Sequence, residues 1–384
     1  SDTMKYILSI LLLLAPVTAY GSACTSAATG NWSAPGTWSS CGGGVPGSGD
    51  TASIGAHAVT VDVNTTVGTS PNDATTKVID ITSGSGVLVI TATLTIFGNI
   101  GLVNGSTITM NAGSGLVFDA SASGGTPVYT FVNAGFTRLN VNGTSGSHCS
   151  ISAVSGQTFN ITSSYSVLSI TYADFTRMAD AVQVTASNID SSITYCTFTS
   201  CGKFTYNSSA GGTQNRTFSY NTFTSGTNAE TPPQDFRLLI SVAYTSGRRE
   251  CIGNVFTKAF TYNSQQVIGT QNYFGGGIDG TAGAYWASFR LNFTNGVRSN
   301  GQLIYPTVER NYFFTDSSAG NPHFVDGRAT AQDTVISQNI FESHQPDLVD
   351  TGDCILMTGT STSGGFKVVA RNNLVLKNSL DPVS

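Results

Sequence analysis

The sequence is poor in charge, in histidine and in long apolar runs. Charged residues make up only 10% of the 384 residues, 4 residues are histidine, and the formal net charge is −5. No basic stripe could neutralise a phosphate backbone, so we do not expect a nucleic-acid partner. The chain has no Cys-x-x-Cys pair, and its histidines are scattered, which argues against a zinc site.

Helical periodicity is also missing beyond the first residues. Short runs at 59–63, 87–91 and 106–110 are rich in β-branched residues and are separated by Gly, Asn and Ser. The 43 glycines add to this preference for short strands and turns over helices. The composition therefore predicts an all-β protein.

One short phrase recurs in the second half of the chain: an apolar residue, two variable positions, a small polar residue, another variable position and an aromatic residue. The copies are Ile170–Phe175, Ile193–Phe198, Phe218–Phe223, Cys251–Phe256, Val308–Phe313, Ile336–Phe341 and a looser Val369–Leu374. The position two before the last residue reads Ala173, Cys196, Asn221, Asn254, Asn311, Asn339 and Asn372. Repeats at this spacing predict a solenoid, with the gap from Phe256 to Phe313 spanning about two turns.

Each position of the phrase has an expected physical role. The aromatic residue should form a buried column along the axis, because one coil cannot bury its apolar face alone. The asparagine is expected at the turn, since Asn tolerates the left-handed backbone region and its amide both donates and accepts. Stacked asparagines should therefore bond to one another and to the turn backbone.

These features resemble the right-handed parallel β-helix superfamily, which includes pectate lyases, polygalacturonases and phage tailspikes and whose members share Asn-bearing turns. A second resemblance concerns Trp32, Trp38, Pro46, the Gly49-Asp50 pair and the strand that ends at Asp62. In this order they are similar to the opening module of secreted bacterial β-helix proteins, which implies an amino-terminal cap. The tryptophans either fill the core of that cap or stack on sugars; core filling is the simpler reading.

The organisation that we predict is a signal peptide at 4–23, the cap and first strands at 24–75, and a β-helix at 76–384 that continues beyond this sequence or lacks a carboxy-terminal cap. Lys5, the apolar run 6–14 and small residues before Cys24 have the layout of a secretory signal. No other segment is apolar enough to span a bilayer. We therefore expect a secreted or cell-surface protein; a lipoprotein anchored at Cys24 is the alternative.

Seven cysteines fit an oxidising compartment. Cys24 and Cys41 bracket the Trp-rich segment, so a disulfide is expected between them. Cys196 and Cys201 either pair across a turn or pack in the core.

The catalytic signatures of the resembled enzymes are absent, which leaves function to the loops. Charge gathers after the aromatic position in the carboxy-terminal half, where the candidate catalytic residues are Asp326, Arg328, His323 and Glu342. Paired carboxylates could hydrolyse a glycosidic bond, and Arg328 or His323 could take a proton in an elimination while acids hold Ca²⁺. The alternative is that these residues are solvated loop charges. No other cofactor is expected.

Two aromatic groups are candidates for sugar binding. Tyr273, Tyr285, Trp286 and Arg290 lie in the long gap between phrases and offer flat rings beside glycines and a hydrogen-bond donor. Alternatively, Tyr285 and Trp286 are the core residues of a coil within that gap.

Tyr172, Tyr195 and Tyr220 recur three positions before the aromatic residue of the phrase and would form a file on adjacent coils. Strand alternation favours burial of this file. An exposed file would instead bind glycan.

We therefore expect a secreted β-helix protein that presents a glycan-binding or adhesive surface to a polysaccharide or surface glycan. Whether it is an enzyme is left open by the sequence; a polysaccharide lyase or glycoside hydrolase is the first alternative. A passive envelope or fibre component is the second.

Overall fold

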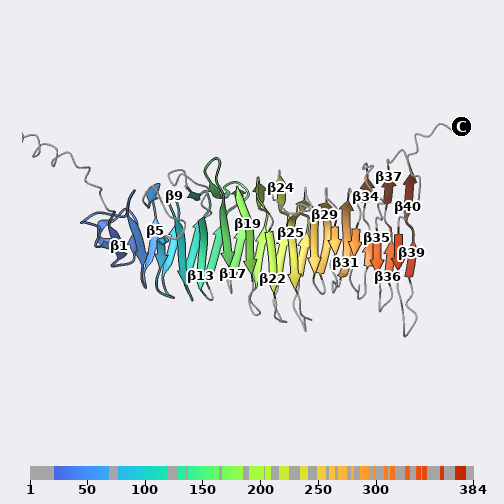
Figure 1. The fold of residues 1–384 in the computed structure, drawn as a ribbon, viewed down its shortest axis with the longest axis horizontal. Coiled ribbons are helices and arrows are strands. Elements are labelled where there is room, and N and C mark those ends of the chain that lie inside the picture. Colours follow the sequence, from blue (N-terminus) through green and yellow to red (C-terminus); the bar gives the residue numbers. More distant parts are fainter. Residues whose placement is uncertain are drawn as a thin grey trace, which may run out of the picture.

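The computed structural model describes residues 21–68, 77–119, 129–134, 137–163, 167–184, 190–202, 204–208, 216–224, 234–240, 249–256, 259–263, 267–274, 278–280, 286–293, 297–299, 307–309, 312–315, 325–328, 334–338, 340–343, 355–358 and 368–377. Of the predicted signal peptide at 4–23, residues 4–20 lie outside them. The chain is a parallel β-solenoid whose coils follow one another along the long axis (Figure 1). The fold-class prediction is confirmed in this respect.

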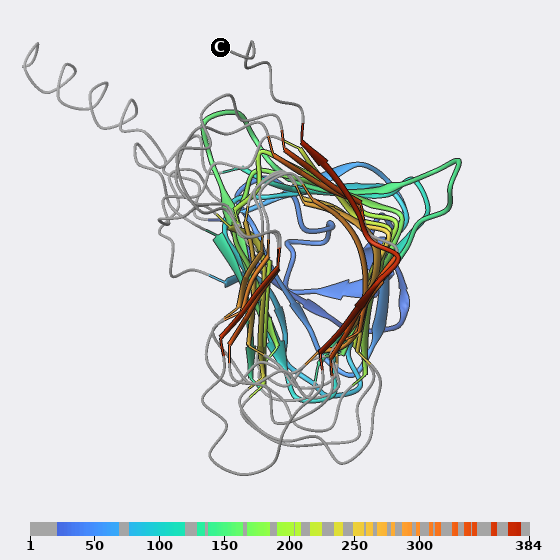
Figure 2. The same cartoon turned by 90° about the vertical axis from the view of Figure 1, so that its right-hand side faces the viewer.

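Each coil contributes strands to three ladders, which nest when viewed along the axis (Figure 2). Sheet A contains, in spatial order, β3 (Trp38–Ser39), β1 (Ala23–Ser26), β4 (Thr51–Ile54), β7 (Lys77–Ile81), β10 (Asn99–Val103), β13 (Tyr129–Ala134), β16 (Phe159–Ser163), β19 (Met178–Val184), β22 (Phe204–Ser208), β25 (Gln234–Ile240), β28 (Ala259–Asn263), β30 (Ile278–Gly280), β32 (Val297–Ser299), β35 (Val325–Arg328) and β38 (Ile355–Thr358).

The second sheet bends into two ladders. Ladder B contains β2 (Gly30–Asn31), β5 (Ala58–Val61), β8 (Val87–Ile90), β11 (Thr107–Asn111), β14 (Arg138–Asn142), β17 (Val167–Thr171), β20 (Ser191–Thr194), β23 (Arg216–Ser219), β26 (Arg249–Ile252), β33 (Thr307–Glu309), β36 (Thr334–Ser337) and β39 (Val368–Arg371). Ladder C contains β6 (Thr65–Val67), β9 (Thr93–Ile96), β12 (Gly115–Phe118), β15 (Cys149–Ala153), β18 (Ala173–Thr176), β21 (Thr197–Thr199), β24 (Thr222–Thr224), β27 (Val255–Phe256), β34 (Tyr312–Thr315), β37 (Ile340–Ser343) and β40 (Leu374–Lys377). The long strands β29 (Val267–Phe274) and β31 (Trp286–Phe293) run through both ladders, and the 3-10 helix η1 spans Pro35–Thr37.

Side chains alternate between the core and the outer face, as parallel strands of a solenoid require. In β5, β8 and β9, for example, every second residue is buried. The predicted aromatic column is present on ladder C, where Phe175, Phe198 and Phe223 are buried and in register. Their rings stack at centroid distances of 4.9 and 4.5 Å.

The register corrects two details of the repeat. Between Phe256 and Phe313 the column continues through Phe274 and Phe293, so the gap holds two extra coils rather than one. These coils of about 19 residues are shorter than their neighbours, because β29 and β31 pass the corner without a break. The last phrase is shifted by one residue: Val375 pairs with Phe341, so it spans Ala370–Val375.

The asparagine column is also present, although the left-handed residue is not the asparagine. Asn221 and Asn254 are fully buried. The Asn221 side-chain amide donates to the Ile193 carbonyl at 3.0 Å, and its oxygen accepts from the Cys196 backbone N–H at 3.0 Å. Asn254 repeats both bonds one coil later, to the Phe218 carbonyl at 2.8 Å and from the Asn221 backbone N–H at 2.9 Å. The positive φ lies one residue earlier, at 58° for Tyr220 and 65° for Gly253.

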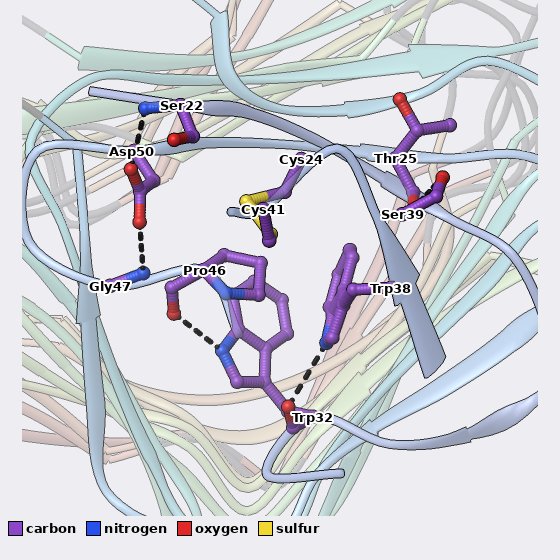
Figure 3. Close-up of a disulfide and its surroundings, with 10 residues drawn as sticks. All are labelled: Ser22, Cys24, Thr25, Trp32, Trp38, Ser39, Cys41, Pro46, Gly47 and Asp50. Atoms are coloured by element: carbon purple, nitrogen blue, oxygen red, sulfur yellow. Dashed lines mark hydrogen bonds between the residues drawn. A yellow bond between two sulfur atoms is a disulfide. The ribbon is translucent and has the colours of Figure 1, made fainter. Parts of the chain in front are cut away.

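The amino-terminal segment is packed around two tryptophans and a disulfide (Figure 3). Cys24 and Cys41 are bonded, as predicted. Trp32 and Trp38 are buried, with their ring centroids 4.7 Å apart. Their indole N–H groups donate to the carbonyls of Pro46 and Trp32, respectively. Both rings therefore fill the core and offer no face to a sugar.

Cys149, Cys196 and Cys201 are buried and form no disulfide. Of the two alternatives for Cys196 and Cys201, the structure shows packing in the core and not a disulfide. Burial raises the pKa of Cys196 to about 12. Its thiol stays protonated near neutral pH, which makes it an inert core residue.

Candidate functional site

The corner between ladders B and C is a single left-handed residue in several coils. This corner column contains Tyr172, Tyr195, Tyr220, Gly253, Gln338 and Asn372, with φ between 49° and 65°. The left-handed residue interrupts strand alternation, so Ile193 and Cys196 on either side of one such corner both point into the core. The tyrosine between them turns outward instead.

Burial of the tyrosine file (Tyr172, Tyr195 and Tyr220) was expected from continuous alternation, and that expectation is wrong. Tyr195 is 43% exposed and Tyr220 is 45% exposed. They are the only exposed aromatic residues among the side chains that the structure describes. The file is thus the main aromatic feature of the described surface.

The rings of the file are stacked face to face along the solenoid axis. Tyr172 and Tyr195 have centroids 4.8 Å apart with an interplanar angle of 14°. Tyr195 and Tyr220 are 4.9 Å apart at 9°. Because near-parallel rings start from equivalent backbone positions, the phenol oxygens form a row with the spacing of the coils.

Ring stacking alone does not offset the backbone strain of the tyrosines. A bulky residue in the left-handed region costs about 1–2 kcal/mol. An aromatic pair returns only about 0.5–1.5 kcal/mol beyond its buried area, and the file has fewer pairs than strained residues. Other coils fill the same corner with Gly253 or Asn372, which suit this backbone better, or with Gln338. Repeated strain at an exposed site is a reason to consider function.

The ends of the file are covered, so its ring faces are not free. Tyr220 lies over Gly253, where an added Cβ would sit 2.5 Å from the Tyr220 ring. At the other end the His148 ring lies 5.5 Å from Tyr172. What reaches solvent is therefore a row of ring edges and hydroxyls. No hydrogen bond within the described part of the chain uses these phenol groups.

A polar pair and a turn flank the first tyrosine. His148 Nδ1 and Asp174 Oδ1 are 3.0 Å apart. His148 ends a turn closed by backbone bonds between Thr144 and Ser147, whose tip is exposed. Cys149, the next residue, pairs with Ala173, which places the turn beside Tyr172 at one end of the file. Neither His148 nor Asp174 was among the predicted site residues, because the pair forms only through this register.

The predicted sugar-binding residues of the long gap lie on β29 and β31. Tyr273 pairs with Val255, which pairs with Thr222, which in turn pairs with Thr197. Tyr273 therefore lies in the column of ladder C next to the corner. Trp286 pairs with Val267 and Arg290 with Thr270 in ladder B. Tyr285 lies outside the described residues.

The predicted catalytic residues are spread over two sheets. Asp326 and Arg328 belong to β35 of sheet A, whereas Glu342 belongs to β37 of ladder C, and His323 lies outside the described residues. Asp326 pairs with Arg298, which in turn pairs with Asp279. The register thus aligns residues of alternating charge in one row of sheet A.

Within the described ranges, no three His, Cys, Asp or Glu residues lie close enough together to hold a metal ion. No helix there has the length and hydropathy of a membrane span. Comparison of the chain with protein-family models, with curated proteins and with solved structures finds no match.

Proposed function

We propose that this is a secreted or cell-surface β-helix protein that binds glycans through the tyrosine file and has an adhesive rather than a catalytic role. The observation that carries the proposal is the exposed, stacked file, whose stacking alone does not offset its backbone strain. Phenol hydroxyls both donate and accept, as sugar hydroxyls do. The predicted signal peptide and the Cys24–Cys41 disulfide fit an extracytoplasmic site of action.

Each contact in this binding mode is weak. A sugar cannot stack on rings whose faces are already covered, so it meets only edges and hydroxyls. A polymer of repeated sugars can contact several tyrosines of the file. Once its first sugar is bound, the later sugars are held at a high effective concentration near the remaining tyrosines, which raises the overall affinity. The proposal is therefore binding to a polymer, with low affinity for single sugars.

The test is retention on immobilised polysaccharides. A variant with Tyr172→Asn, Tyr195→Asn and Tyr220→Asn keeps residues that the corner tolerates, since Asn372 occupies the same column naturally. Gln338→Asn is the matched control, because it introduces the same residue in the corner column away from the file. We expect the triple variant to lose retention and the control to keep it. Equal retention of the parent protein, the triple variant and the control would refute the proposed site.

A second candidate is a polysaccharide lyase or glycoside hydrolase that uses the charged row of sheet A. The observation in its favour is the register of Asp279, Arg298 and Asp326 on one column. An enzyme would release unsaturated or reducing ends from a polysaccharide, and Asp326→Ala or Arg328→Ala would abolish the release. A protein that neither binds nor cleaves glycans would be a passive envelope or fibre component.

A further inference from the structure

We infer that the tyrosine file takes a neutral, fully extended glycan that runs along the solenoid axis with one sugar per coil. This rests on the proposed function, because it assumes that the file binds glycan. It adds the charge, the conformation and the direction of the ligand.

The direction of the ligand follows from the spacing of the rings in the tyrosine file. Neighbouring rings are 4.8 and 4.9 Å apart, which is the rise of one coil. A flat β-1,4-linked hexose chain advances by nearly the same length per sugar, so successive sugars can meet successive phenols. An α-1,4-linked chain coils and advances less per sugar, and it would lose this register after the first contact.

The charge of the ligand follows from the columns beside the file. On the ladder B side these columns hold Thr171, Thr194 and Ser219, and on the ladder C side they hold Asp174, Thr197 and Thr222. Asp174 is the only carboxylate in this set, and it lies 3.0 Å from His148 Nδ1. None of these six positions beside the file is a lysine or arginine, and the ladder B column reaches a cation, Arg290, only three coils beyond Ser219. A uronic-acid polymer would therefore meet a carboxylate and no matching cation, which disfavours it.

The length of the ligand follows from the ends of the file. The turn that ends at His148 stands at one end, and at the other the corner column continues with Gly253, which has no side chain to offer. Affinity should therefore rise as sugars are added up to about three and then level off, since later sugars meet no further phenol.

Calorimetric titration with defined oligosaccharides tests these points. Cello-oligosaccharides of one to six glucose units should bind more tightly with each unit up to about three. Malto-oligosaccharides of the same length, which differ only in linkage, should bind at least about tenfold more weakly. Oligogalacturonates, extended but acidic, should also bind more weakly, and the deficit should shrink when salt is raised.

Tyr195→Phe is the sharpest variant, because it keeps the stacked ring and removes only the central hydroxyl. We expect it to weaken cellotriose binding by about threefold to tenfold, the loss of one modest hydrogen bond. Gln338→Asn again serves as the control and should bind as the parent does.

Each outcome decides between distinct conclusions. If cello- and malto-oligosaccharides bind equally, if the acidic oligomers bind best, or if Tyr195→Phe changes nothing, the inference is wrong while glycan binding stands. If no oligosaccharide and no polysaccharide binds at all, the proposed function fails with it.

Discussion

The corner between ladders B and C is built in two ways along the solenoid. In the amino-terminal coils it is a wider turn, such as the segment 112–114, in which the Ser114 N–H donates to the Asn111 carbonyl. Apart from β29 and β31, which pass the corner without a break, the described coils from Tyr172 onward turn at one left-handed residue. The buried side-chain amides of Asn221 and Asn254 bond to backbone groups at these corners. The column next to the corner changes as well, from Leu94, Leu116 and Ile151 to stacked phenylalanines.

The difference shows that one solenoid cross-section can be stabilised by separate means. Aliphatic columns with wide turns rely on burial and local backbone bonds. Tight corners need a residue that accepts a positive φ and an internal partner for backbone groups that face the core. Among the described coils, the tight corner turns its residue outward, and the tyrosine file lies at such corners.

The largest effect should come from the aromatic column. Phe198 is buried and stacks on Phe175 and Phe223, so Phe198→Ala should lower the free energy of unfolding by about 3–5 kcal/mol. Phe198→Leu installs the side chain of the amino-terminal coils and should cost only about 1–2 kcal/mol, since it loses stacking but keeps most of the volume. Urea unfolding followed by circular dichroism measures both. If alanine and leucine cost the same, the two regions do not differ as described.

The amide column should come next. Asn221→Ala leaves the Cys196 N–H and the Ile193 carbonyl without their partner, at about 1–3 kcal/mol for each buried group. We expect a loss of about 2–4 kcal/mol in the same urea assay. Cys196→Ala, one coil earlier in the same column, should cost about 1 kcal/mol or less, because Cys196 contributes no amide. A small loss for Asn221→Ala would mean that the tight corner does not depend on its asparagine.

Substitution of the tyrosine file should have a smaller effect on stability. Tyr195→Asn exchanges a stacked ring for a residue that suits a φ of 56°, so the unfolding free energy should change by less than about 1 kcal/mol. Tyr195→Val should be destabilising by about 1–2 kcal/mol, because a β-branched residue fits this conformation poorly. If the Asn variant loses more than the Val variant, the file stabilises the corner and its functional reading weakens.

The smallest effect concerns a wide corner of the amino-terminal region. The Ser33 hydroxyl and backbone N–H bond to Asp62, and this holds the pKa of Asp62 below its ordinary value. The stability that results is present above the unfolded pKa of about 3.9 and is lost as the pH falls through the lower folded value. Asp62→Asn should therefore lower the urea midpoint slightly at pH 7 and not at pH 2. An equal shift of the urea midpoint at pH 7 and at pH 2 would mean that the effect comes from packing and not from the charge of Asp62.

The architecture could be predicted because the phrase fixes two buried columns at a constant distance in the chain. The two positions that Phe223 and Asn221 occupy in the phrase mark the same corner in each coil that carries it. The amino-terminal coils escaped detection because their corners vary in length, which breaks the spacing between Leu94 and its neighbours along the chain. One coil within the gap was expected and two are present; the coil that ends at Phe274 does not match the phrase although Asn272 lies two before Phe274, since Gly269 occupies the position where an apolar residue was required.

The candidate site could be predicted only in part. The recurrence of Tyr172, Tyr195 and Tyr220 was visible, but their exposure depends on which residue at the corner takes the positive φ. From the sequence, the positive φ is expected at the asparagine, because Asn is the residue in the phrase that best tolerates it. Burial of Asn221 leaves the strained conformation to its neighbour, a result of three-dimensional hydrogen bonding that no local preference predicts.

Spin-label distances measured by pulsed electron resonance test the stacked coils most directly. Thr66, Thr95 and Thr224 lie on one outward column of ladder C, with Thr66 six coils and Thr95 five coils from Thr224. Labels on cysteines introduced at Thr66 and Thr224 should be about 29 Å apart, and those at Thr95 and Thr224 about 24 Å apart. A difference of about one coil rise between the pairs supports the solenoid, whereas distances that do not increase with the number of coils would contradict it.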